Sequence, residues 1–155
     1  MQCTRNDTPA APHGAPMARR LLDPPGLGEP AAPFSHGVRS GDTIWVSAQA
    51  GVDATGRVIG GDDPEAQCRA LFERIRAILA EGGATPSDIV MVRGFLKDRS
   101  CLQATWNVRR AFFGTHRPAS TSFMVSDLEP AGALMSFEVV AVVDEPQRDA
   151  AGDES

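Results

Sequence analysis

Residues 38–49 alternate between apolar and polar side chains with a period of two. Ile44, Val46 and Ala48 fall on one side of residues 43–49, and mostly polar residues fall on the other. This alternation is typical of a strand with one buried face. Residues 38–40 form a shorter stretch of the same kind, and the Ser-Gly-Asp at their end is a hairpin signal. We therefore predict an antiparallel hairpin, with strands at 38–40 and 43–49.

The apolar spacing changes to that of a helix after residue 63. Asp63 and Pro64 are the residue types preferred at an N-cap and at a first helical position, and Gly82-Gly83 ends the pattern. The apolar residues in between share one stripe, which consists of Cys68, Leu71, Ile75, Ile78 and Leu79. Such a stripe predicts a helix that packs against a flat surface.

A second helix is predicted from the N-cap residue Ser100 to about Phe113. Leu102, Trp106 and Phe113 lie on one side of it at helical spacing. We expect these three residues to form its apolar face.

Strand patterns at residues 88–97, 120–125 and 135–143, and an Arg-Arg-Leu-Leu near residue 19, complete the order β-β-(β)-α-β-α-β-β. This order predicts an α+β fold, in which a single mixed sheet of five or six strands has two helices on one face. The other face of the sheet still carries Val, Met and Phe. We therefore expect an oligomer that covers it.

The two ends of the chain differ in composition from the middle. Residues 1–33 hold seven of the twelve prolines and many Ala and Gly, which is too little apolar surface to offset the entropy of ordering. We predict a disordered extension at 1–18, a folded domain at 19–143 and a disordered acidic tail at 144–155. Met17 is a candidate for the biological start.

Charge is concentrated at the C-terminal end. The chain has a net charge of −5, and residues 144–155 contain five acidic residues and Arg148, so the rest of the chain is close to neutral. Duplex binding needs clustered Lys and Arg, so a nucleic-acid partner is not expected. No apolar run approaches the roughly 18 residues of a spanning helix, so no membrane partner is expected.

Cys3, Cys68 and Cys101 are too few and too far apart for a disulfide framework or a CxxC metal site. Cys68 and Cys101 fall in helical patterns and are expected to be buried. No secretory signal pattern precedes the domain, so we predict a reducing cytoplasm. No set of His, Cys, Asp and Glu has metal-ligand spacing, so no metal site is predicted.

Several segments of residues 19–143 resemble, in order and at near-correct spacing, those of the RidA/YjgF superfamily. The segments are Pro33-Phe34-Ser35, the Trp-Val-Ser-Ala-Gln of 45–49, helix 67–83, strand 89–98, helix 104–113, Arg117-Pro118-Ala119 and strand 137–142. The resemblance implies a chorismate-mutase-like fold in a homotrimer, with inward-facing sheets and three small-molecule clefts between subunits. It also implies hydrolysis of imines or enamines, such as 2-aminoacrylate, without a cofactor.

The chain departs from this family at three functional positions. Where the deaminases place an Arg that binds the substrate carboxylate through a bidentate pair, this chain has Ser120. Ser136 replaces the first Glu of the family's Glu-x-Glu, which helps to position water, and Phe34 replaces a cleft Tyr. Losing the Arg contact alone should weaken binding by roughly 1.5–3 kcal/mol. We therefore expect a less cationic, more apolar cleft that suits a larger or less anionic ligand.

His36 and Glu138 are the candidate catalytic residues. His36 follows the cleft loop, and an imidazole titrates near neutral pH; Glu138 keeps the second Glu of the family pattern. Each also has a structural interpretation, namely a strand-edge His bonded to backbone and a carboxylate paired with an Arg. The candidate substrate-binding residues are Phe34, Ser35, Ser47, Asn107, Ser120 and Ser136.

Arg93 lies mid-strand on the side of Met91 and Phe95. It either replaces the lost carboxylate anchor or forms an inter-subunit or helix-facing ion pair.

Two functions follow from the resemblance and from the three positions at which the chain departs from the family. The first is a RidA-like enzyme that acts on an imine, enamine or related carbonyl compound by a mechanism without the usual Arg. The second is a non-catalytic small-molecule binding or regulatory trimer. A nuclease role fits the near-neutral domain least well.

Overall fold

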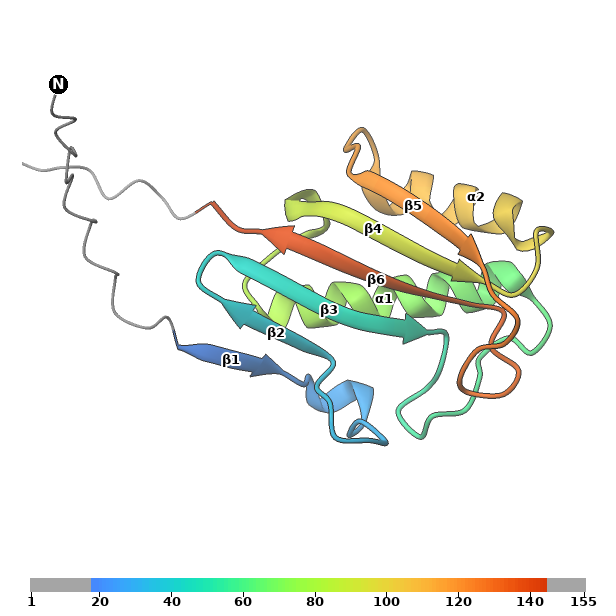
Figure 1. Cartoon of the computed structure of the whole chain (residues 1–155), viewed down its shortest axis with the longest axis horizontal. Helices are drawn as coiled ribbons and strands as arrows, with labels where there is room; N and C mark the ends of the chain where they lie inside the picture. Colours follow the sequence, from blue (N-terminus) through green and yellow to red (C-terminus); the bar gives the residue numbers. More distant parts are fainter. Residues whose placement is uncertain (1–17, 145–155) are drawn as a thin grey trace, which may run out of the picture.

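One mixed sheet carries both helices on the same face, as the computed structural model of the chain shows (Figure 1). The structure describes residues 18–144, so most of the predicted extension at 1–18, the start at Met17 and most of the tail at 144–155 lie outside the described residues. The six strands are ordered β1-β2-β3-β6-β4-β5. This confirms the predicted α+β architecture.

The observed elements follow the predicted order closely. They are β1 (Arg19–Leu22), β2 (Gly37–Ser40), β3 (Thr43–Ala50), α1 (Pro64–Glu81), β4 (Ile89–Leu96), α2 (Cys101–Phe113), β5 (Ala119–Met124) and β6 (Met135–Val142), with short 3-10 turns at Pro25–Leu27 and Pro86–Asp88. Strands β4 and β5 are parallel, and every other neighbouring pair is antiparallel.

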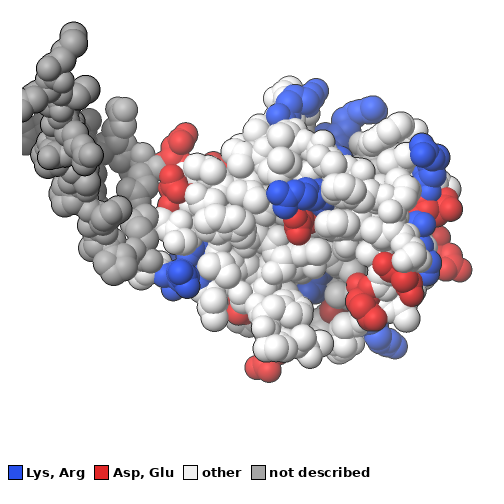
Figure 2. Space-filling view, in the orientation of Figure 1, with Lys and Arg blue, Asp and Glu red and all other residues white. Residues whose placement is uncertain are grey.

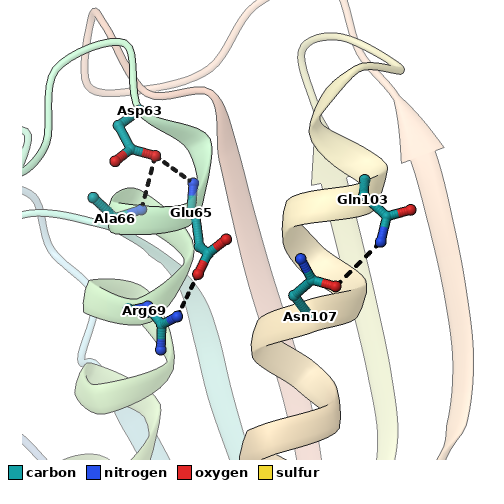
Figure 3. A network of polar contacts seen from close by, with 6 residues as sticks. All are labelled: Asp63, Glu65, Ala66, Arg69, Gln103 and Asn107. Atoms are coloured by element: carbon teal, nitrogen blue, oxygen red, sulfur yellow. Dashed lines mark hydrogen bonds and ion pairs between the residues drawn. The ribbon is translucent and has the colours of Figure 1, made fainter.

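The core lies between α1, α2 and the sheet. The five stripe residues of α1 are fully buried, and they pack with the inward residues of β6, Met135, Phe137, Val139 and Ala141. Asp63 caps α1 as predicted, because its carboxylate accepts hydrogen bonds from the backbone N–H groups of Glu65 and Ala66 (Figure 3). The predicted burial of Cys68 and Cys101 is also confirmed.

The alternation predicted for β3 does not continue to its end. The register between β3 and β6 shifts between Val46 and Gln49, where β3 carries one residue more than its partner. Such a bulge turns the following side chains over, so Ala48 is exposed whereas Gln49 and Ala50 are buried. The predicted burial of Ala48 is therefore wrong.

The predicted apolar face of α2 is wrong at Trp106. The Trp106 side chain is 53% exposed, because the helix buries the smaller residues Cys101, Ala104, Thr105 and Val108 instead. Ser100 is at the N-cap, but its side chain makes no capping bond.

The face of the sheet without helices is largely apolar and open. Leu21, Trp45 and Phe123 on this face are 63%, 48% and 47% exposed. Figure 2 shows this face as mostly uncharged, with charged groups together near its middle. Arg93 lies on the open face of the sheet and not on the face that the helices cover. It forms an ion pair there with Glu138 of the neighbouring strand. Within residues 18–144, no helix is long and apolar enough to cross a membrane.

Candidate functional site

The predicted site residues fall into four places on the chain. Phe34, Ser35, His36 and Ser47 lie together where the loop before β2 meets β3. The remaining candidates lie on the open face of the sheet, at the start of β5 and on α2. The first of these places adjoins a cavity, which Phe34 and His36 border.

This cavity has a volume of about 530 Å³ and is bordered by Phe34, His36, Gln49 and Arg74. Its volume is in the range of small-molecule pockets. Phe34 is 53% exposed, whereas His36 and Gln49 are 5% and 3% exposed. The cavity therefore has an exposed aromatic side and a buried polar side, which is the arrangement expected for a small-molecule site.

One hydrogen bond fixes the backbone of His36 and another fixes its imidazole ring. Its backbone N–H donates to Asp23 Oδ1 at 2.7 Å, and its Nε2 lies 3.0 Å from the carbonyl oxygen of Gly28. A carbonyl only accepts, so Nε2 carries the proton, and in the neutral ring Nδ1 has the free lone pair. Within residues 18–144, nothing forms a hydrogen bond to Nδ1. The bond from Nε2 to a backbone carbonyl is the one expected for a structural histidine. The other ring nitrogen, Nδ1, remains available as a base.

Ser35 and Ser47 are joined to each other. The Ser47 hydroxyl donates to the carbonyl oxygen of Ser35 at 2.8 Å, and the Ser47 N–H donates to the carbonyl of His36 at 2.9 Å. These bonds fix the loop that carries Phe34 and His36 against β3. Ser47 therefore positions the loop.

Arg74 and Gln49 complete the buried side of the cavity. Arg74 comes from α1 and Gln49 from β3, and Arg74 Nε donates to Gln49 Oε1 at 3.1 Å. Burial lowers the pKa of the Arg74 guanidinium, an effect that the charge of Asp53 offsets in part. The cavity thus contains a fixed positive charge.

Glu138 and Ser136 are on the open face of the sheet, away from the helices. Glu138 is paired with Arg93, directly opposite it in the β4–β6 ladder. This is the structural interpretation of Glu138. Ser136, the next residue but one, is opposite Phe95 and 7% exposed.

Ser120 at the start of β5 is bonded to an arginine of α2. Arg109 Nη2 donates to Ser120 Oγ at 2.8 Å, and burial lowers the pKa of the Arg109 guanidinium. The expectation of a less cationic site was based on the loss of a positive charge at residue 120. Within the chain, Arg109 places a guanidinium beside this position, and the charge of a cleft between subunits stays a prediction.

Asn107 does not join any of these groups. It is exposed on α2, where its Oδ1 accepts from Gln103 Nε2 of the preceding turn at 3.1 Å (Figure 3). Within one chain, therefore, Asn107 contacts none of the other predicted residues through a hydrogen bond.

Sequence reasoning missed Arg74, Gln49 and Arg109. Arg74 had a visible signal, because it lies three residues after Leu71 and directly before Ile75, inside the apolar stripe of α1. A charged residue in a buried stripe is unusual unless another group pairs with it. Gln49 had no comparable signal, because its burial depends on the bulge in β3.

Comparisons with known proteins agree on one family. Residues 27–143 match the family model described as endoribonuclease L-PSP. A RutC family protein of Pyrococcus abyssi is 33% identical over 81% of this chain and 98% of its own length. A 2-iminobutanoate/2-iminopropanoate deaminase of Dermatophagoides farinae is 27% identical over the same shares, 81% and 98%. The crystal structure of the YjgF gene product of E. coli matches with a TM-score of 0.72 and 28% identity, over 79% of this chain and 98% of that one.

Proposed function

The chain belongs to the RidA/YjgF superfamily, and from this membership we propose that it is an enzyme that acts on a small imine, enamine or related carbonyl compound. The reaction proposed is hydrolysis, in which water adds to the carbon of a C=N bond and the nitrogen leaves as ammonia. Because residue 120 is Ser, the usual Arg-dependent mechanism is not the one proposed.

The observation that carries this proposal is the orientation of His36. The bond from Nε2 to Gly28 fixes the tautomer, and His36 borders the cavity. Nδ1 can then take a proton from water as it attacks carbon, and the imidazolium can return a proton to the departing nitrogen. His36 is thus the proposed acid and base, and Phe34 is the proposed apolar wall.

We further propose that the protein is a homotrimer with clefts between its subunits. The open apolar face of the sheet supports this, because a monomer would leave Leu21, Trp45 and Phe123 in water. Such an assembly would bring Ser136 and Glu138, which lie on the open face, near a neighbouring chain. The free thiols Cys68 and Cys101 fit a reducing compartment, for which we propose the cytoplasm.

The test is imine hydrolysis with 2-aminoacrylate generated in situ, followed by pyruvate formation. A His36→Gln variant keeps an N–H donor for Gly28 but has no basic nitrogen. We expect the unmodified protein to accelerate pyruvate formation about 10²-fold or more over the variant, with equal melting temperatures. Equal rates in the two proteins would exclude His36 as the acid and base.

A second candidate function is a non-catalytic small-molecule binding or regulatory protein. The observation in its favour is that Glu138, the other candidate for proton transfer, is bonded to Arg93. Saturable binding of ligands in the cavity without any turnover of imines would support this function over the first.

A further inference from the structure

Arg74 is a buried cation whose hydrogen bonds all go to neutral groups. The residue is 8% exposed. Its Nε donates to Gln49 Oε1 at 3.1 Å, and its Nη1 donates to the backbone carbonyls of Leu27 and Val52, both at 3.3 Å. No carboxylate of residues 18–144 forms an ion pair with it. Burying a charge costs free energy unless the charge is paired. An anion bound beside Arg74 would lower this cost.

The carboxylate whose charge acts on Arg74 is already engaged in other hydrogen bonds. Asp53 lowers the cost of burying Arg74 by its charge. Its Oδ1, however, accepts hydrogen bonds from the backbone N–H groups of Thr55 and Arg57 and from the Thr55 hydroxyl. Asp53 therefore holds the turn after β3 in shape and does not bond to the guanidinium.

The free edge of the guanidinium is open to the cavity. Nη2 makes no hydrogen bond with residues 18–144. No side-chain nitrogen in that range is both closed off from solvent and without a partner. Since Arg74 borders the 530 Å³ cavity, an anion that enters the cavity can accept a hydrogen bond from Nη2.

The cavity is bordered by one arginine and three carboxylates. Arg74 is buried, Asp53 is half-buried and occupied by the hydrogen bonds of its own turn, and Glu29 and Glu129 are exposed on the surface loops. The walls between them are mostly apolar, with Leu27, Phe34 and Val52 among them. A simple anion would have to pass two negative charges, whereas a ligand with a positive end would be attracted by them.

We propose that this cavity binds an organic carboxylate that carries a cationic group at the other end of an apolar body. The carboxylate accepts charge-assisted hydrogen bonds from Arg74, the body packs against the apolar walls, and the cation lies between Glu29 and Glu129. The inference rests on the proposed function only in naming this cavity as the ligand site. It identifies Arg74 as the residue that orients the ligand.

Three matched probes test this arrangement by calorimetry or by chemical-shift titration. 4-(Aminomethyl)benzoate has both charges at opposite ends of a ring, benzoate has the negative charge alone and benzylamine has the positive charge alone. We expect the first probe to bind the intact protein at least about tenfold more tightly than either of the others. Tighter binding of benzylamine, or no binding of any probe up to about 10 mM, would overturn the proposal.

Variants assign the two ends of the ligand. Arg74→Gln should weaken 4-(aminomethyl)benzoate and benzoate about tenfold or more and leave benzylamine unchanged. Arg76 lies on the exposed side of the same helix. Arg76→Gln is therefore the matched control and should leave the affinities of all three probes unchanged. If Arg74→Gln does not fold, Arg74→Lys is used instead. It keeps the charge but not the planar guanidinium, so it should bind benzoate more weakly than the unmodified protein does but still measurably.

The double variant Glu29→Gln/Glu129→Gln changes only exposed side chains. It should weaken 4-(aminomethyl)benzoate and strengthen benzoate, and the opposite pattern would contradict the proposed orientation. The probes do not react, so the outcomes are separable from those of catalysis. Binding that depends on Arg74, with turnover that ignores His36, would refute the proposed function alone; turnover that needs His36, without probe binding, would refute this inference alone.

Discussion

Arg93 of β4 and Glu138 of β6 lie directly opposite each other and form an ion pair on the open face of the sheet. Their side chains are 46% and 31% exposed, and pairs as exposed as this contribute about 1 kcal/mol or less. On the same two strands, the next residues on this face include the apolar Phe95 and Val140. Its energetic importance therefore depends on whether another chain covers this face.

Glu138→Gln is expected to weaken assembly far more than it destabilises the separate chain. In the proposed trimer, Arg93 would be left as an uncompensated charge in a covered interface, at a cost of about 3–5 kcal/mol. Sedimentation of the variant should show a shift toward monomer at concentrations where the unmodified protein is assembled. The double variant Arg93→Gln/Glu138→Gln should recover part of the assembly. A monomeric mass for the unmodified protein would refute the trimer and the clefts between subunits.

Trp45→Asp should prevent assembly without unfolding the chain. Trp45 is 48% exposed on the open face, so its replacement removes little from the core of the chain itself but places a charge in the proposed interface. Ile59→Asp is the matched control, because Ile59 is 40% exposed in the loop between β3 and α1. Equal masses for the two variants in sedimentation would show that the open face is not the interface.

The fold was predictable because its signals are local. The stripe of α1, its Asp63 cap and the strand patterns each depend on a few neighbouring residues. Ala48 and Trp106 were misassigned because the bulge in β3 and the rotation of α2 are set by tertiary packing, which local periodicity does not report.

The candidate site was predictable only in part. Phe34, Ser35, His36 and Ser47 are close in sequence or joined by one hairpin, so their grouping follows from the strand pairing. The bond between Arg109 and Ser120 requires α2 to lie over β5, and the approach of Arg74 to Gln49 requires α1 to cross β3. These contacts between distant segments are fixed by the packed fold.

Cys68 should be unreactive in the folded protein at pH 8. Burial raises the pKa of its thiol from 9.0 to about 12, although the charges of Arg109 and Arg69 lower it slightly. The thiolate is the reactive form. A Cys3→Ser variant should therefore give no reaction of Cys68 with a thiol reagent until it is unfolded by urea. Rapid labelling under native conditions would contradict the burial of this residue.

The same shift predicts a loss of stability in alkali. The folded protein binds the Cys68 proton more tightly than the unfolded chain does, so this contribution to stability is complete below about pH 9. It declines as the pH rises from 9 toward 12. Urea unfolding at several pH values should show a steeper decline for the unmodified protein than for Cys68→Ala, which has no thiol to ionise. Parallel declines would show that the thiol is not the group responsible.

Ser120→Arg alone should do little to improve hydrolysis of 2-aminoacrylate. Arg109 Nη2 already lies 2.8 Å from Ser120 Oγ, so a new guanidinium at residue 120 would be repelled by an existing one. The Arg109 guanidinium also lies 5.9 Å from the ring centres of Phe113 and Phe137, and a leucine there would keep much of the apolar contact. The double variant Arg109→Leu/Ser120→Arg should therefore leave the loop arginine free to bind a substrate carboxylate.

We expect pyruvate formation about tenfold or more faster in the double variant than in Ser120→Arg, with Arg109→Leu as the control for loss of the α2 charge. If Ser120→Arg alone is as fast as the double variant, Arg109 does not compete for this position, and the guanidinium of α2 has no part in the electrostatics of the site.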